Sequence, residues 1–120
     1  MNLIRCLHIT NDNEAIQQMK RVGVDPTGVK LMEGKTLHLN LKVEGIDPRK
    51  ANLLKQEMLS LGGDAAVDRR GLDCSAESTD AILMGTYKQF EKLASKLEHY
   101  PGVEALGHSF RDTLKNLSKA

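Results

Sequence analysis

The sequence has few aromatic residues and no strong excess of one charge. Aromatic residues make up 3% of the 120 residues, and tryptophan is absent. Proteins that hold single-stranded nucleic acid stack its bases on aromatic side chains. The net charge is +1 and the charged residues are dispersed, whereas a duplex-binding protein usually carries a basic face. We therefore expect no nucleic-acid partner.

Cysteines and long apolar runs are also scarce. The two cysteines, Cys6 and Cys74, do not make a disulfide framework. No apolar run reaches the roughly 18 residues of a transmembrane helix, and no signal peptide is recognisable. The four histidines show no metal-ligand spacing among themselves or with the cysteines. These absences predict free thiols in a reducing cytoplasm, no membrane partner, and no metal or other cofactor.

The length of the chain predicts one domain. A chain of 120 residues is close to the commonest domain size. At this length about two thirds of the surface of the unfolded chain is buried on folding, which is enough for a hydrophobic core. We therefore predict a compact, soluble single domain over residues 1–120.

Apolar spacing in the first third of the chain predicts strands alternating with helices. Leu3–Ile9 is a short apolar stretch that favours a buried strand. The N-cap formers after it favour a helix that ends at Gly23. A second, shorter helical turn begins at Asp25 and ends at Gly34. The clearest strand is Leu37–Glu44, where apolar and polar residues alternate.

The middle of the chain predicts a helix between two strands. Gly45 is expected to end the preceding strand. Asp47 is a good N-cap and Pro48 suits the first helical position, where its missing N–H costs nothing. Gly62 is expected to terminate this helix, and Ala65–Val67 forms a short candidate strand.

The remaining residues predict two extended segments and two helices. The extended segments are Leu72–Ser75 and Asp80–Met84. Thr86 and Gln89 fit a capping box at the start of the next helix, and a last helix carries an apolar stripe over Val103–Leu117. The order of elements predicts an α/β fold, with a small mixed or parallel sheet of about four strands covered by helices.

The turn Gly85–Gln89 is the strongest candidate for a binding site. Backbone N–H groups at a helix start, a glycine and a nearby lysine suit a phosphate or carboxylate. The spacing matches neither the Rossmann nor the P-loop pattern. The alternative is that the glycine relieves a tight turn and the threonine only caps the helix. The anion-binding candidates here are Gly85, Thr86 and Lys88.

Arg69 and Arg70 are two further candidates for the same anion. If the strands are parallel, right-handed crossovers place the turns that follow Val67 and Met84 at one edge of the sheet. Two guanidinium groups can then clamp a phosphate with paired hydrogen bonds. The alternative is a solvated charged turn, which is what exposed charge runs usually are.

No residues show the pattern of a catalytic site. A G-x-S-x-G segment is absent, and Cys74 is flanked by acid rather than base, so no activated thiol is expected. His8 has no assigned partner, and no acid–base or nucleophile pair can be identified. We therefore predict that this chain alone is not a complete enzyme, and a self-contained enzyme is the least favoured hypothesis.

Two stretches are more distinctive than their local structure requires. They are Lys50–Val67, with the sequence KANLLKQEMLSLGGDAAV, and Thr79–Gln89, with the sequence TDAILMGTYKQ. Together they resemble the N-terminal extension of a prokaryotic subset of dihydropteroate synthases, ahead of the catalytic pterin-binding barrel. The resemblance runs from about Leu3 to Leu117. It implies folate biosynthesis, in which the associated enzyme joins a pterin pyrophosphate to p-aminobenzoate.

The resemblance supplies no catalytic residue. The pterin-binding segment of the family, of the Asn-Val-Thr-Pro-Asp-Ser-Phe type, is absent, and a (β/α)₈ barrel needs on the order of 250 residues. The first hypothesis is thus a non-catalytic accessory domain whose partner is a dihydropteroate synthase barrel, fused or separate. It predicts an exposed apolar patch on the Leu93–Leu117 helices. The alternative is a stand-alone anion-binding module using Gly85–Gln89, and a homodimer remains open.

Overall fold

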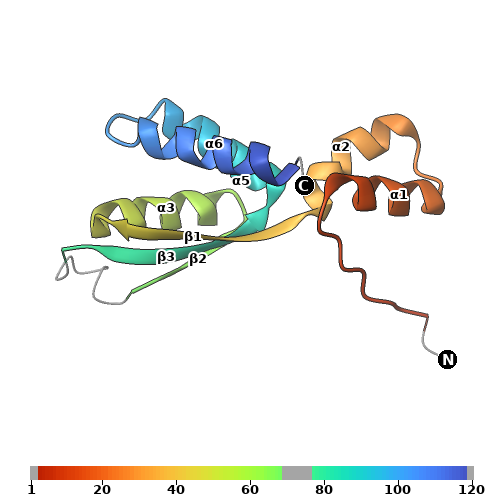
Figure 1. Ribbon diagram of the computed structural model, residues 1–120, viewed down its shortest axis with the longest axis horizontal. Helices are drawn as coiled ribbons and strands as arrows, with labels where there is room; N and C mark the ends of the chain where they lie inside the picture. Colours follow the sequence, from red (N-terminus) through yellow and green to blue (C-terminus); the bar gives the residue numbers. More distant parts are fainter. Residues whose placement is uncertain (1–2, 69–76, 119–120) are drawn as a thin grey trace.

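The computed structural model of the chain describes residues 3–68 and 77–118. Within these ranges it has a mixed α/β architecture of helices packed on one small sheet (Figure 1). The elements in chain order are α1 (Asp12–Val22), α2 (Pro26–Thr36), β1 (His38–Ile46), α3 (Pro48–Ser60), β2 (Asp64–Val67), β3 (Thr79–Thr86), α5 (Tyr87–Glu98) and α6 (Glu104–Ser118).

The three strands form one antiparallel sheet with β3 in the middle. Leu41 of β1 and Ala65 of β2 both lie opposite Leu83 of β3, and both pairings are antiparallel. The outer strands β1 and β2 therefore run in the same direction on either side of β3, and α3 connects them (Figure 1).

The prediction of about four strands in a mixed or parallel sheet is wrong for the described residues. Neighbouring parallel strands need a crossover of about a dozen residues or more, usually a helix. The connection from β2 to β3, residues 68–78, is shorter and therefore suits antiparallel pairing. Leu3–Ile9 has no regular secondary structure, so it is not the strand that was predicted. Leu72–Ser75 lies in residues 69–76, outside the described residues.

The capping signals predicted from the sequence are confirmed. Gly23 takes the left-handed conformation, with φ of 94°, at the end of α1. Asp47 caps α3 and Pro48 occupies its first turn. Thr86 and Gln89 form a capping box at the start of α5. One boundary was wrong, because α2 continues past the glycine expected to end it and reaches Thr36.

Gly45 bends β1 rather than ending it. Its φ is 64°, a left-handed conformation that favours glycine. The pairing with β3 shifts register between Val43 and Ile46, as in a β-bulge. The carboxylate of Asp80 on β3 accepts a hydrogen bond from the Gly45 N–H at 2.9 Å. The strand therefore continues to Ile46.

One face of the sheet carries the core. Along β3, Ala81 and Leu83 are buried, while Ile82 and Met84 are exposed on the opposite face. Helices α3, α5 and α6 lie on the buried face (Figure 1). The main core consists of Leu54, Met58, Ala65, Leu83, Phe90, Leu93, Ala94, Leu97, Val103, Phe110 and Leu114.

The apolar stripe of the last two helices, where an exposed patch was predicted, is largely buried within the described residues. Leu93 and Leu97 are fully buried, and Leu114 is 2% exposed. These side chains face the sheet because the apolar stripes of α5 and α6 both belong to the main core.

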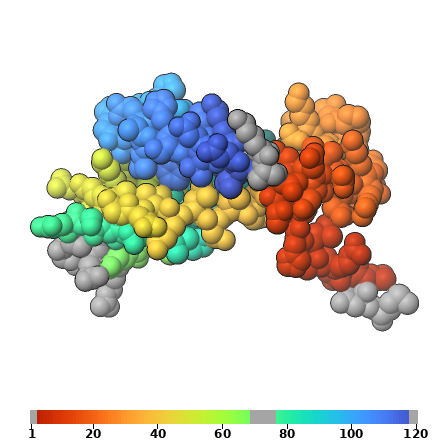
Figure 2. Space-filling model, viewed as in Figure 1, coloured from red at the N-terminus to blue at the C-terminus, as the bar shows by residue number. Residues whose placement is uncertain are grey.

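The molecule is more extended than the compact domain that was predicted. Its radius of gyration is 16.5 Å, against about 13.6 Å expected for a compact chain of this length. Helices α1 and α2 pack on each other around a separate small cluster of Ala15, Met19 and Val29. They form one end of the molecule, and the described residues that precede α1, from residue 3 onward, project from it (Figures 1 and 2).

Candidate functional site

The predicted anion-binding turn lies at the junction of β3 and α5. The Thr86 N–H donates to Gln89 Oε1 at 2.9 Å, and the Gln89 N–H donates to Thr86 Oγ1 at 3.1 Å. The Tyr87 N–H donates to the Leu37 carbonyl at 2.8 Å. Three of the N–H groups that could bind an anion at a helix start are therefore already bonded within the protein.

Gly85 is explained by packing inside the protein. A Cβ atom at this position would lie 2.8 Å from Met58 Cε and 2.9 Å from Gln89 Oε1. Both distances are shorter than real Cβ contacts, so a side chain here would require the ends of the Met58 and Gln89 side chains to move. The space beside Gly85 is thus filled by the chain itself, which supports the tight-turn interpretation.

Lys88 lines a hollow of mixed charge. The hollow has a volume of about 310 Å³ and lies between α1, α2 and α5. Two lysines, Lys88 and Lys30, share it with the carboxylates of Asp12, Glu33 and Glu91. The carboxylates outnumber the lysines, so the charges around this hollow do not favour the binding of an anion.

Arg69 and Arg70 lie outside the described residues. Val67, at the end of β2, pairs with Ala81 near the start of β3, whereas Gly85 lies near the end of β3. The expectation that the turn after Val67 shares an edge with Gly85 is therefore wrong, because it depended on parallel strands. A role for the two arginines in anion binding stays a prediction.

We expect inorganic phosphate to leave the melting temperature of the chain unchanged. A ligand that binds only the folded state raises that temperature, and three of the N–H groups at the α5 start already donate within the protein. The measurement is thermal unfolding with phosphate up to about 10 mM, with chloride at equal ionic strength as control. A rise of several degrees that Lys88→Ala abolishes would instead establish the anion site.

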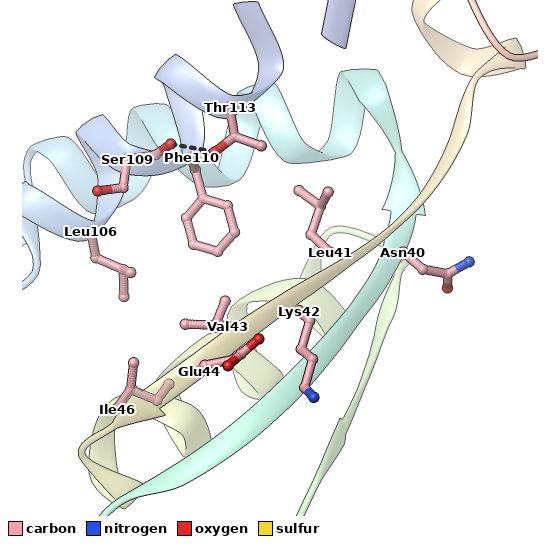
Figure 3. A pocket seen from close by; sticks show the side chains of 10 residues that line it. All are labelled: Asn40, Leu41, Lys42, Val43, Glu44, Ile46, Leu106, Ser109, Phe110 and Thr113. Atoms are coloured by element: carbon pink, nitrogen blue, oxygen red, sulfur yellow. Dashed lines mark hydrogen bonds between the residues drawn. The ribbon is translucent and has the colours of Figure 1, made fainter. Parts of the chain in front are cut away.

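The structure has a groove between the outer edge of β1 and α6. Its volume is about 420 Å³. Leu41 and Val43 point into it from β1, and Leu106 and Phe110 point toward them from α6 (Figure 3). The side chain of Lys42 points away from α6 (Figure 3). The groove is therefore apolar inside and polar at its rim.

The groove also exposes the backbone of β1. Residues 40–44 line it consecutively, although their side chains alternate between the two faces of the sheet. Within the described residues, β1 pairs with β3 on one side only and is an edge strand. An edge strand presents unpaired N–H and C=O groups to a further strand. The groove thus combines main-chain hydrogen-bonding groups with apolar pockets, an arrangement that suits an extended peptide.

The polar groups of the groove do not form a catalytic set. Thr113 Oγ1 donates to the Ser109 carbonyl at 2.9 Å (Figure 3). No histidine or cysteine lines the groove, and its charged residues are Lys42 and Glu44 on β1. A general acid or base must reach its substrate within hydrogen-bond distance and have a suitable pKa. We therefore interpret the groove as a binding surface.

A charged cluster joins α5 to α6. The Arg111 guanidinium donates to the Glu98 carboxylate at 2.7 and 2.9 Å, and also to Ser95 Oγ at 2.8 Å. His108 Nδ1 lies 2.9 Å from the same carboxylate. The hydrogen bond from Arg111 lowers the pKa of Glu98 below its ordinary value of 4.5, and it raises the pKa of Arg111. Both shifts favour the charged forms, as in a structural ion pair.

We expect Glu98 to make stability depend on acid pH. Because its pKa is lower in the folded chain, the ionised carboxylate stabilises the fold above pH 4.5, and this contribution is lost as the pH falls through the folded pKa. Glu98→Gln should lower the melting temperature at pH 7, and the difference from wild type should shrink as the pH falls through the lowered pKa of Glu98. Asp112→Asn, at an exposed position on α6, is the control. A difference that is constant with pH would contradict this account.

The described ranges also bear on metal binding and on membrane crossing. No group of three or more His, Cys, Asp or Glu side chains there could hold a metal ion. Among the same residues, no helix is long and apolar enough to cross a membrane.

Comparison with known proteins finds two proteins that are similar to this chain over a part of their length. No protein-family model and no solved structure matches the chain. Over 104 residues it is 38% identical to a protein of Halobacterium salinarum named "Probable bifunctional folylpolyglutamate synthase/dihydropteroate synthase". Over 70 residues it is 39% identical to a protein of the same name from Haloferax volcanii.

Each match covers a large share of this chain but only a small share of the relative. The first match covers 85% of this chain but 12% of the Halobacterium protein. The second covers 58% of this chain and 8% of the Haloferax protein. Most of the chain is thus similar to a small part of proteins named as bifunctional folylpolyglutamate synthase/dihydropteroate synthases.

Proposed function

We propose that this chain is a non-catalytic accessory domain of a folate-pathway enzyme, with a dihydropteroate synthase barrel as its fused or separate partner. The observation that carries the proposal is the similarity of 85% of the chain to 12% of a bifunctional enzyme. A segment of that size is too small for a dihydropteroate synthase barrel. A dihydropteroate synthase barrel alone needs on the order of 250 residues.

The arrangement of the described residues supports a role without chemistry of its own. The charged cluster of Glu98 and Arg111 forms an ion pair between two helices, and the β1–α6 groove has apolar walls and a strand edge. Surfaces of this kind bind a protein segment. The binding energy of such a contact comes from apolar burial and main-chain hydrogen bonds.

The proposal also assigns this domain a position in the parent enzyme, on the N-terminal side of the barrel. The two stretches Lys50–Val67 and Thr79–Gln89 resemble the N-terminal extension of dihydropteroate synthases, and they form α3, β2 and β3 with the start of α5. This part of the fold comprises the central strand β3, the outer strand β2 and the helix α3. The proposal therefore includes an N-terminal location in the parent enzyme, which acts in the cytoplasm.

The test is removal of the similar region from the Halobacterium protein. We expect the truncated enzyme to keep its dihydropteroate synthase turnover within about tenfold, since no catalytic group is lost. A loss of about 100-fold or more, the size expected when a general acid or base is removed, would contradict the proposal if the truncated enzyme stays folded. Circular dichroism of both forms checks the fold.

The excised region provides the matched control. Added back as a separate chain, it should bind the truncated enzyme, seen as co-elution in size-exclusion chromatography. This chain, added in its place, should compete for the same site. Failure of both chains to bind, with both folded, would count against a docked accessory domain.

A further inference from the structure

The residues before α1 form an exposed apolar segment. Leu3–His8, called here the N-terminal segment, projects away from the folded body (Figures 1 and 2). Leu3 is 87% exposed and Leu7 is 45% exposed. The segment has the apolar composition of a buried strand. Exposed apolar surface of this kind marks an interaction site.

The segment is held in place at its C-terminal end. Ile9 packs against the small cluster between α1 and α2. The Thr10 N–H donates to Glu14 Oε2 at 2.9 Å, and Thr10 Oγ1 donates to Glu14 Oε1 at 3.2 Å. These contacts fix the direction in which the chain enters α1. The N-terminal segment therefore points away from the β1–α6 groove of its own copy (Figure 1).

The groove and the N-terminal segment are both apolar, and they are similar in length. The groove offers the free edge of β1 and the apolar side chains of Leu106 and Phe110. An added strand gains main-chain hydrogen bonds from such an edge, and its alternate side chains fill the pockets beside it. Six residues of strand span about 20 Å, and six residues of β1, between Asn40 and Ile46, line the groove.

We propose that the N-terminal segment of one copy adds as a fourth strand to the edge of β1 in a second copy, with its alternate side chains in the β1–α6 groove. The exchange is reciprocal, so both segments and both grooves are occupied and the assembly closes as a two-fold dimer. It buries the exposed apolar segment and pairs an otherwise open sheet edge.

The first test is the oligomeric state in solution. Analytical ultracentrifugation of the wild-type chain over a concentration series should show a monomer–dimer equilibrium. The double variant Leu3→Asp, Leu7→Asp should dimerise at least about tenfold more weakly, because it brings charges into an apolar groove. Leu59→Asp is the matched control, since Leu59 is also 45% exposed but lies on α3. It should dimerise as the wild type does.

The second test changes the groove instead of the segment. Ser109 is exposed on α6 and lines the groove, so Ser109→Asp should leave the fold intact and weaken dimerisation to a similar extent. A wild-type chain that stays monomeric at all concentrations would overturn the proposal. A dimer that is unaffected by charges in the segment and in the groove would overturn it as well.

The third test separates exchange between copies from folding back within one copy. Cys6 is a free, exposed thiol in the segment, and Lys42 is exposed on β1. One copy carries Cys6 with Cys74→Ser, and the other carries Cys6→Ser, Cys74→Ser and Lys42→Cys. Oxidation of the mixture should give a disulfide-linked pair of unlike copies. Cross-linking that occurs only within a chain carrying both thiols would overturn the proposal.

Discussion

Phe90→Ala should lower the free energy of unfolding by about 3–5 kcal/mol, the usual cost of removing a fully buried phenylalanine. Phe90 has no exposed surface. Its ring stacks on Phe110 of α6 with 6.2 Å between the ring centroids. Truncation would leave a cavity between the sheet and both C-terminal helices, at the centre of the main core. Urea unfolding, followed by circular dichroism, measures the change.

The control for this variant is another aromatic residue near the same helix. Tyr100 follows α5 and is 45% exposed, so Tyr100→Ala should change stability by no more than about 0.5 kcal/mol. If Phe90→Ala proves too unstable to purify, Phe90→Leu keeps most of the volume and should cost less. Equal effects of Phe90→Ala and Tyr100→Ala would show that the main core is placed incorrectly.

Gly107→Ala should destabilise the fold by about 1–3 kcal/mol, as overpacking a close contact usually does. A Cβ atom at Gly107 would lie 2.7 Å from the Glu98 backbone N and 3.0 Å from the Ala94 carbonyl O. Backbone atoms cannot move aside as a side chain can, so α6 would be pushed away from α5. The Glu98–Arg111 ion pair crosses the same contact and would be strained.

A second helical glycine supplies the control for Gly107. At Gly34 in α2, an added Cβ would lie 3.4 Å from Lys88 Cβ, a tolerable distance. Gly34→Ala should therefore be neutral, or stabilise by up to about 1 kcal/mol through its helix propensity. Thermal unfolding of both variants measures the contrast. A Gly107→Ala variant as stable as Gly34→Ala would contradict the close approach of α5 and α6.

Local signals in the sequence predicted the helices well. The start of α3 at Asp47 and the capping box of Thr86 and Gln89 depend on neighbours within one turn. The alternation over Leu37–Glu44 likewise predicted β1, because one face of the strand packs on the core. The end of α2 was missed, since Gly34 in a helix is only mildly unfavourable and a helical glycine is tolerated.

The sheet could not be predicted from the same signals. Leu3–Ile9 has the composition of a strand, but a strand exists only if a partner edge lies beside it. In the described chain, Ile9 is instead packed against α1 and α2. The relative direction of β2 and β3 depends on how the two strands pair, which the spacing of apolar residues does not reveal. For that reason, the prediction that the turns after Val67 and Met84 lie at the same edge of the sheet was wrong.

The groove could not be predicted because its residues have the composition of a core. Leu41, Val43 and Phe110 follow ordinary helix and strand periods, and the sequence does not show that β1 is at the edge of the sheet. The resemblance to an enzyme extension came from distinctive stretches, not from periodicity. It is supported in its coarser part by the similarity to two bifunctional proteins.

The most direct measurement of the central claim is an activity assay on the purified chain. The chain is incubated with a pterin pyrophosphate and p-aminobenzoate, and the pteroate product is quantified against a blank without protein. A non-catalytic accessory domain gives no product above the blank. Sustained turnover that scales with the concentration of the chain would contradict the account, because it would require catalytic residues within these 120 residues.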